Sequence, residues 1–296
     1  MGNEGNLNMS IDNIRRLQRI RKQDHLILHE GEVPYLTFEA LDAYPWLGHA
    51  FSTRLGGATP GERGSMNLSL AALGDGHEDV LENYRRMARS VGFDHEKTVG
   101  ALQVHGTKIV RVGASDAGSG VIRQNVFTRE DGFVTNEPGI CLCVYFADCV
   151  PLFAVDPKKR AIGSAHSGWR GTVAGIGTKL VEKMAFEFGS SAQDLVCCIG
   201  PSICPDCYEV SEDVAEAFEN AYSGEVLKKM LFPKGGGKYR LDLHEASFEN
   251  FVKAGVRPEN ISVTDICTCC EKDLIFSHRG AKGGPHGLSA GFIFIR

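Results

Sequence analysis

Three residues of metal-binding types each follow a short apolar segment. His105 comes after the strand-like run 99–104, Cys149 follows the run 141–146 closely, and His166 comes directly after the run 161–165. In α/β folds, ligand sites gather at the carboxyl ends of strands. Two imidazole nitrogens and one thiolate suit Zn²⁺, and three protein ligands leave a fourth position for water or substrate. The pattern indicates a catalytic zinc site, although each residue taken singly is more often a scaffold histidine or a core cysteine.

The segment 166–172 also has a pattern typical of an anion site. It reads HSGWRGT and is expected to run from a strand into a helix. Gly168 permits close backbone approach, and the amides of a first helical turn together with Arg170 suit a phosphate group. The same letters fit a tight turn with Thr172 as the helix N-cap and Trp169 in the core. The residues alone leave both interpretations open.

Two carboxylates are candidates for proton transfer. Asp148 precedes Cys149 and could orient a ligand histidine or act as an acid or base, and Glu209 is the second candidate. The plainer alternatives are a strand-ending aspartate and an exposed glutamate that opens a helix. Further candidates for substrate or phosphate binding are Arg54, Asn67, Gln103, Ser167, Gly168 and Arg279.

The chain has ten cysteines, four of which form two C-x₂-C pairs. The first pair is Cys204 and Cys207, and the second is Cys267 and Cys270. Alone, this pattern argues for a structural Zn(Cys)₄ site or a redox pair. A chain of this length without an export signal does not need disulfides, so we expect reduced thiols.

Strands and helices alternate through the middle of the chain. Short apolar runs bounded by Pro, Asp or Gly predict strands at 141–146, 152–155 and 161–165. Apolar residues at helical spacing predict helices at 80–91 and 172–188, with further helices near 212–221 and 243–254. Glycine-rich stretches at 56–64, 235–237 and 280–287 predict loops. We therefore expect an α/β or α+β class with mixed sheets and, because no linker interrupts the chain, a single domain.

The composition limits the classes of partner. The chain has 296 residues, of which 43% are hydrophobic and 23% charged, with a net charge of −5 and a pI of about 6.1. The negative charge argues against nucleic acid or an anionic membrane as the main partner, and no run approaches the ~18 apolar residues that span a bilayer. We expect residues 1–30 to be a tail with a short basic helix, and the protein to be cytoplasmic and a monomer or weak homodimer.

Ten short segments resemble, in order, those of the YfiH/YlmD family, also called laccase-domain or polyphenol oxidase proteins. The segments are TRLGG at 53–57, SMNL at 65–68, QVHG at 103–106, DG at 131–132, ADCVP at 147–151, HSGWRG at 166–171, GP at 200–201, YEV at 208–210, CT at 267–268 and FSHR at 276–279. The resemblance implies that residues 31–296 form a catalytic domain with an α/β/β/α sandwich fold. It also implies that the metal ligands are His105, Cys149 and His166, and that Cys207 and Cys267 fall at positions where the family carries cysteine without a second metal. The chain departs from the family near its end, where PHGL at 285–288 replaces a Thr-Gly-Arg sequence.

The resemblance implies zinc-dependent chemistry on purine nucleosides. The expected reactions are phosphorolysis of adenosine, inosine, guanosine or methylthioadenosine, and hydrolytic deamination of adenosine. Zinc suits deamination because it acidifies water for attack on C6 of adenine. Arg170 and a helix N-terminus could position phosphate against the ribose, and Asp148 or Glu209 could protonate the departing base.

Two other functions stay open from the sequence. The first is copper-dependent phenol oxidation, since copper can replace zinc at these donors. Against it, the ten histidines include no His-x-His pair, and no methionine lies close in the sequence to His105, Cys149 or His166. The second is a Cys-His hydrolase acting on cell-wall precursors, with Cys149 as nucleophile and His105 or His166 as base.

Overall fold

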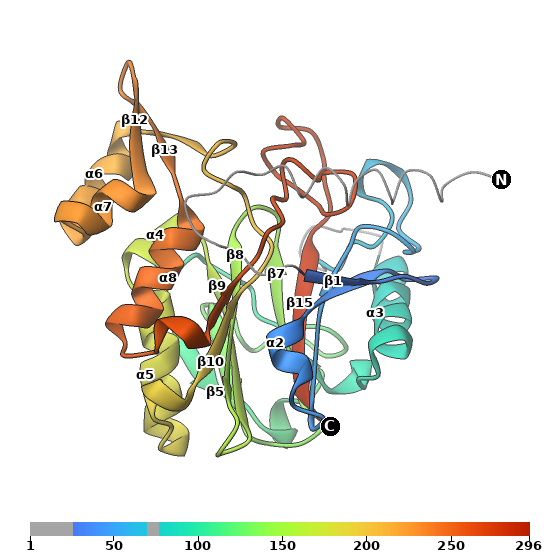
Figure 1. The fold of residues 1–296 in the computed structure, drawn as a ribbon. Coiled ribbons are helices and arrows are strands. Elements are labelled where there is room, and N and C mark those ends of the chain that lie inside the picture. The colour runs from blue at the N-terminus through green and yellow to red at the C-terminus, as the bar shows by residue number, and fades with distance from the viewer. Residues whose placement is uncertain (1–25, 70–76) are drawn as a thin grey trace.

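The computed structural model describes residues 26–69 and 77–296. Two six-stranded sheets pack face to face, and helices cover both outer faces (Figure 1). This is the expected α/β/β/α sandwich of mixed sheets in a single domain. The expected basic helix near the N-terminus lies outside the described residues, and the segment expected to be a tail includes strand β1 (Leu26–His29), which pairs with β2.

The first sheet joins strands that are far apart in the sequence. β15 lies between β3 and β7, so the last strand of the chain completes the centre of the sheet. All its pairs are antiparallel except that of β4 with β7. In order across the sheet, the strands are β1 (Leu26–His29), β2 (Tyr35–Phe38), β3 (Leu47–Ser52), β15 (Ser289–Ile295), β7 (Cys141–Phe146) and β4 (Thr98–Val99).

The second sheet carries most of the residues expected to do chemistry. Its parallel pairs are β10 with β14 and β5 with β6, and the others are antiparallel. In order, the strands are β14 (Ile261–Val263), β10 (Val196–Ile199), β8 (Val150–Asp156), β9 (Ala161–Ser167), β6 (Gly132–Thr135) and β5 (Ile109–Arg111). A small third sheet has the order β11 (Glu209–Ser211), β13 (Lys238–Leu241) and β12 (Leu231–Gly235).

The helices lie on opposite sides of the sandwich. Figure 1 shows α4, α5 and α8 against the second sheet and α3 against the first. The α-helices are α2 (Glu39–Asp42), α3 (His77–Val91), α4 (Trp169–Val173), α5 (Ile176–Phe188), α6 (Glu212–Ala221), α7 (Gly224–Met230) and α8 (Leu243–Lys253). The 3₁₀ helices are η1 (Gly61–Arg63), η2 (His95–Lys97), η3 (Ala114–Asp116), η4 (Ala192–Asp194) and η5 (Pro258–Asn260). None of the helices in the described residues is both long enough and apolar enough to cross a membrane.

Three hydrophobic cores fix the layers. Between the two sheets, Phe51 of β3 stacks on Phe153 of β8 with ring centroids 4.8 Å apart. Buried side chains of α5 and α8 fill the second core, and Tyr84 of α3 lies in the third. Strands β7 and β8 are buried along their whole length, which explains their continuous apolar sequences.

Two expected elements differ from the structure. The run 99–104 is a strand only at β4, and residues 100–104 form a loop that carries Gln103 toward the site. The helix expected at 172–188 is broken into α4 and α5, because Gly175 adopts a left-handed conformation with φ 81°. The remaining expected strands and helices coincide with or overlap β7, β8, β9, α3, α6 and α8.

Candidate active site

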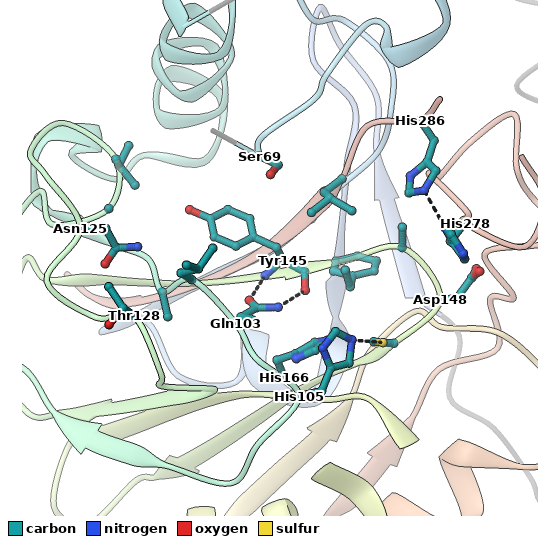
Figure 2. A pocket seen from close by; sticks show the side chains of 18 of the residues that line it. Ser69, Gln103, His105, Asn125, Thr128, Tyr145, Asp148, His166, His278 and His286 are labelled. Atoms are coloured by element: carbon teal, nitrogen blue, oxygen red, sulfur yellow. Dashed lines mark hydrogen bonds between the residues drawn. The ribbon is translucent and has the colours of Figure 1, made fainter. Parts of the chain in front are cut away.

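The three expected metal ligands converge from three segments. His166 is in β9, Cys149 immediately precedes β8, and His105 is in the loop after β4. Their ligand atoms all lie within 4.8 Å of one another. The Cys149 sulfur is 3.9 Å from Nε2 of His105, and the two imidazole rings meet edge to face (Figure 2). One soft sulfur and two imidazole nitrogens so close together form a donor set that suits zinc.

Asp131, at the start of β6, holds two of these ligands in place. Its carboxylate accepts hydrogen bonds from the backbone N–H groups of Val104, His105 and Gly106 at 3.2, 2.9 and 2.7 Å. Its Oδ1 is also 2.9 Å from Nδ1 of His166. That contact directs Nε2 of His166 toward Cys149, an arrangement common around metal-bound histidines. Asp131, and not Asp148, is therefore the carboxylate that orients a ligand histidine.

The electrostatics of the site favour the thiolate form of Cys149. Burial would raise the pKa of Cys149, but the charge of His166 and hydrogen bonds from His105 and His166 outweigh it and lower the pKa to about 6. Burial would lower the pKa of His166, but the Cys149 thiolate and Asp131 raise it to about 9. Burial would likewise raise the pKa of Asp131, yet its hydrogen bonds from His166 and Gly106 lower it. A cysteine binds a metal ion as the thiolate, and the environment of Cys149 already favours that form.

The backbone packs closely against the metal-binding side chains. A Cβ atom added to Gly168 would lie 2.6 Å from Cδ2 of His105 and 3.2 Å from the sulfur of Cys149. His105 and Asp148 both adopt positive φ values, 62° and 91°, which cost energy for residues other than glycine. The glycine and the two strained residues together support a site built to bring these donors into contact, so the residues present fit a metal ion.

We expect Asp131→Asn to weaken metal binding. The amide keeps the size of the side chain but loses the charge that supports His166, and loss of such a partner costs about 10- to 100-fold in affinity. Competition with a chelator measures the change. Asp156→Asn is the matched control, because Asp156 is also buried and accepts backbone hydrogen bonds, at 2.9 and 3.0 Å, but lies at the far end of β8. Equal affinities for all three proteins would contradict the role of Asp131.

A cavity of about 930 Å³ opens over the three ligands. Figure 2 shows Asn125 and Thr128 on one side of the view, His278 and His286 on the other, and the ligand histidines between them. Near Asn125, the walls include the apolar side chains of Leu102, Val121 and Ile122. A large concave site with apolar walls and a few polar groups is typical of small-molecule binding.

Three of the other predicted site residues line this cavity. The Gln103 side chain bonds both the N–H and the C=O of Tyr145, at 2.7 and 2.9 Å, and so fixes the wall. Asp148 accepts hydrogen bonds of 2.6 Å from the hydroxyls of Thr268 and Ser277 and from the N–H of Arg279. The Arg279 guanidinium lies over the ring of Tyr208 and donates to the carbonyl of Glu209 at 3.1 and 3.2 Å.

The remaining predicted residues do not line the cavity. Arg170 is exposed on the five-residue helix α4, with its guanidinium 4.2 Å from the ring centroid of Trp169. The Glu209 carboxylate pairs with Lys234 at 2.5 Å. Ser167 is buried and bonds the hydroxyl of Thr172 at 2.7 Å.

Arg54 and Asn67 form structural contacts. Arg54 donates to the carbonyls of Gly64 and Lys272 and stacks on Phe276. Asn67 is fully buried and accepts from the N–H groups of Ser69 and Leu288. Both residues therefore stabilise loops near the cavity and do not contact its interior.

Four residues of the site had no assigned role from the sequence. Asp131 positions the ligands, and Tyr208 lines the cavity with a phenol whose pKa is raised by burial and by the charge of Cys149. His278 and His286 also line it, with Nδ1 of the first 2.9 Å from Nε2 of the second. His286 belongs to the PHGL segment, so the departure from the family pattern brings an imidazole into the cavity.

Comparison with known proteins identifies the family. Residues 48–296 match the family described as multi-copper polyphenol oxidoreductase laccase. The chain is 37% identical to a purine nucleoside phosphorylase of Bacteroides thetaiotaomicron over 253 residues, which cover 84% of this chain and 93% of the relative. It is 37% identical over 235 residues to the purine nucleoside phosphorylase YlmD of Geobacillus stearothermophilus, covering 78% and 84% of the two chains.

Solved structures agree with the sequence comparison. The crystal structure of YlmD from Geobacillus stearothermophilus superposes with a TM-score of 0.85 at 34% identity, covering 92% of this chain and 99% of that one. The crystal structure of the hypothetical protein YfiH from Bacillus licheniformis gives a TM-score of 0.84 at 31% identity, covering 91% and 99%. The family match, the sequence identities and the fold thus agree, and the chain belongs to the YfiH/YlmD family of laccase-domain proteins.

Proposed function

We propose that this protein is a zinc-dependent purine nucleoside phosphorylase that also deaminates adenosine. The observation that carries the proposal is one cavity in which the His105, Cys149 and His166 donors lie between an apolar region and a cationic region. The names of the relatives from Bacteroides and Geobacillus support the phosphorylase activity. The wall that includes Leu102 and Ile122 suits a purine base, the segment with Arg279 suits a phosphate, and the metal-binding donors lie between them.

The proposed metal is zinc, bound by His105, Cys149 and His166. Zinc held there supplies a Lewis acid and lowers the pKa of a water molecule, which suits hydrolytic deamination. Asp131 keeps His166 in the orientation that this binding requires, with Nδ1 toward the carboxylate and Nε2 toward the thiolate.

The purine base is proposed to bind against Leu102 and Ile122. These side chains are unusually exposed for large apolar residues, at 46% and 42%, and both line the cavity. An aromatic ligand that covers them removes that surface from water, at about 25 cal/mol per Å². The amide of Asn125 and the hydroxyl of Thr128 are polar groups in the same wall and offer hydrogen bonds to the edge of the base.

Phosphate is proposed to bind at the opposite end, beside Arg279. A guanidinium there attracts the anion, and its five donors suit phosphate oxygens. Positioned in this way, a phosphate oxygen attacks the anomeric carbon of the ribose while the bond to the purine nitrogen breaks. Orientation and charge stabilisation supply most of the catalysis in such a step.

Of the two predicted acid–base carboxylates, Asp148 is the one in the cavity. Both of its oxygens accept hydrogen bonds from the 268–279 segment, so we assign it a positioning role. It fixes the backbone of Arg279 and thereby the direction from which the guanidinium approaches. Glu209 contributes its carbonyl oxygen to the same arginine, while its carboxylate pairs with Lys234.

Copper-dependent oxidation is less well supported. A blue-copper site combines two histidines and one cysteine with a weak axial methionine, and no methionine lines the cavity in the described part of the chain. Within residues 26–69 and 77–296, the other group of three or more potential ligands consists of cysteines alone. Because copper outcompetes zinc for such donors, copper found in a preparation is expected to be adventitious unless phenol oxidation accompanies it.

The test is to incubate the zinc-loaded protein with adenosine, inosine, guanosine or methylthioadenosine, each with and without phosphate. Chromatography is expected to show free base and the ribose 1-phosphate product only when phosphate is present. Adenosine without phosphate is expected to yield inosine. Base release that is independent of phosphate would contradict the phosphorylase, and adenosine that remains unchanged without phosphate would contradict the deaminase.

A further inference from the structure

Four cysteines outside the active site come together from two loops. Cys204 and Cys207 follow β10, and Cys267 and Cys270 follow β14. Because β10 and β14 are parallel neighbours, both loops leave the second sheet at the same edge. An isolated bridge between Ser202 and Cys267 continues their pairing beyond the strands. The two C-x₂-C turns are thereby placed opposite each other.

The four sulfur atoms have the spacing of ligands to one metal ion. All lie within 4.8 Å of one another, and those of Cys207 and Cys270 are 3.5 Å apart. A tetrahedral ion with Zn–S bonds of about 2.3 Å separates its sulfur ligands by about 3.8 Å. A disulfide would require about 2.05 Å, and all four cysteines are free. Iron–sulfur clusters distribute their thiolates over several iron atoms and therefore need a wider spacing.

The backbone around the cluster suits thiolate ligands. The sulfur of Cys267 accepts from the N–H of Cys204 at 3.2 Å and from that of Cys270 at 3.4 Å. Such hydrogen bonds stabilise negative charge on sulfur and orient the ligand. Cys204 and Cys267 are buried, whereas Cys207 is half-buried and Cys270 exposed, so one side of the cluster is open for an ion to reach it.

We propose that Cys204, Cys207, Cys267 and Cys270 bind one Zn²⁺ in a closed structural site, separate from the catalytic metal. Binding releases four thiol protons and forms four Zn–S bonds, so no oxidant or reductant is needed. Four protein ligands leave no open position, which is typical of structural and not of catalytic zinc. The resemblance to the family implies only the His-Cys-His metal, so this second site goes beyond what that resemblance implies.

The cluster supports the wall of the active-site cavity. Ile203 and Tyr208, which flank the first C-x₂-C turn, line the cavity. Thr268, inside the second turn, donates to Asp148 at 2.6 Å. A zinc ion that clamps the two turns together therefore stabilises the segments that position Asp148 and Arg279, without contacting substrate.

The test is the zinc content of the full chain by elemental analysis. We expect two equivalents in the wild type, one in Cys149→Ala, one in the double variant Cys207→Ser with Cys270→Ser, and none in the triple variant. Cys269→Ser is the matched control, because Cys269 lies in the same turn but outside the cluster, and it should retain both ions. X-ray absorption of the Cys149→Ala protein should show zinc with four sulfur neighbours at about 2.3 Å.

Two results would overturn the proposal. One is unchanged zinc in the double variant, and the other is a disulfide among these four cysteines in protein purified without oxidant. If the double variant does not fold, the single variant Cys270→Ser removes the most exposed ligand and should lower the midpoint of thermal unfolding while losing one equivalent. The test does not depend on the proposed activity, since it counts an ion that remains after Cys149 has been removed.

Discussion

Replacing Cys149 with alanine is expected to remove one equivalent of zinc and to reduce adenosine deamination by about a thousandfold or more. Cys149 supplies the only sulfur of the three-residue donor set, within 3.9 Å of His105. A catalytic metal contributes several kcal/mol of transition-state stabilisation, and each 1.4 kcal/mol corresponds to about tenfold in rate. The fold should persist, because Cys149 belongs to none of the three hydrophobic cores. Elemental analysis and an assay of inosine formation measure the two effects.

Cys269→Ala is the matched control for this variant. Cys269 has the same half-buried character as Cys149 and also lies in a loop, but it is outside both groups of potential ligands. It should keep its metal and its activity. Full zinc content together with normal rates in Cys149→Ala would remove the metal site from the mechanism.

Metal removal separates this mechanism from a Cys-His hydrolase. Without metal, Cys149 has a pKa of about 6 beside two imidazoles, which is the environment of a nucleophilic thiolate. A chelated wild-type protein is therefore expected to lose adenosine deamination while Cys149 becomes reactive toward iodoacetamide. If turnover persisted after chelation and was then lost when Cys149 was alkylated, the Cys-His hydrolase mechanism would be supported instead.

The convergence of the three proposed metal ligands could be predicted because its signal is local. Each lies near an end of a short apolar strand, and the expected ends of β7 and β9 fall within two residues of the observed ones. Residue type and position then suffice to bring His166 and Cys149 together, since β8 and β9 are neighbouring antiparallel strands. The loop position of His105 is less local, and its approach depends on Asp131.

What the sequence could not predict depends on contacts between distant segments. Asp131 bonds to Gly106 and His166, which lie 25 and 35 positions away in the sequence. No periodic pattern in the sequence indicates such contacts. The break at Gly175 leaves Arg170 exposed on a short helix. The anion site that was inferred from a longer helix therefore has its arginine outside the cavity lining. The four-cysteine cluster was visible as two C-x₂-C pairs, but its convergence required the parallel pairing of β10 with β14.

Arg279→Ala is expected to raise the phosphate KM by roughly 10- to 100-fold. Arg279 lines the cavity, and a charge-assisted contact to phosphate is worth about 1.5–3 kcal/mol. The effect should appear mainly in KM if the contact serves ground state and transition state alike. Arg279→Lys should recover part of the loss, because lysine restores the charge but not the planar fork. Initial rates at varied phosphate concentration measure these changes.

Comparison with Arg170→Ala decides between the two arginines that the sequence offered for the anion, Arg170 and Arg279. Arg170 is exposed on α4, and an exposed ionic contact is worth up to about 1 kcal/mol, or roughly fivefold in KM. Arg85→Ala on α3, where Arg85 pairs with Glu78, is the control and should change neither activity. Deamination uses no phosphate and should be nearly unchanged in Arg279→Ala. A larger phosphate effect in Arg170→Ala than in Arg279→Ala would move the anion site to α4, whereas equal loss of both reactions in Arg279→Ala would make Arg279 a nucleoside-binding residue.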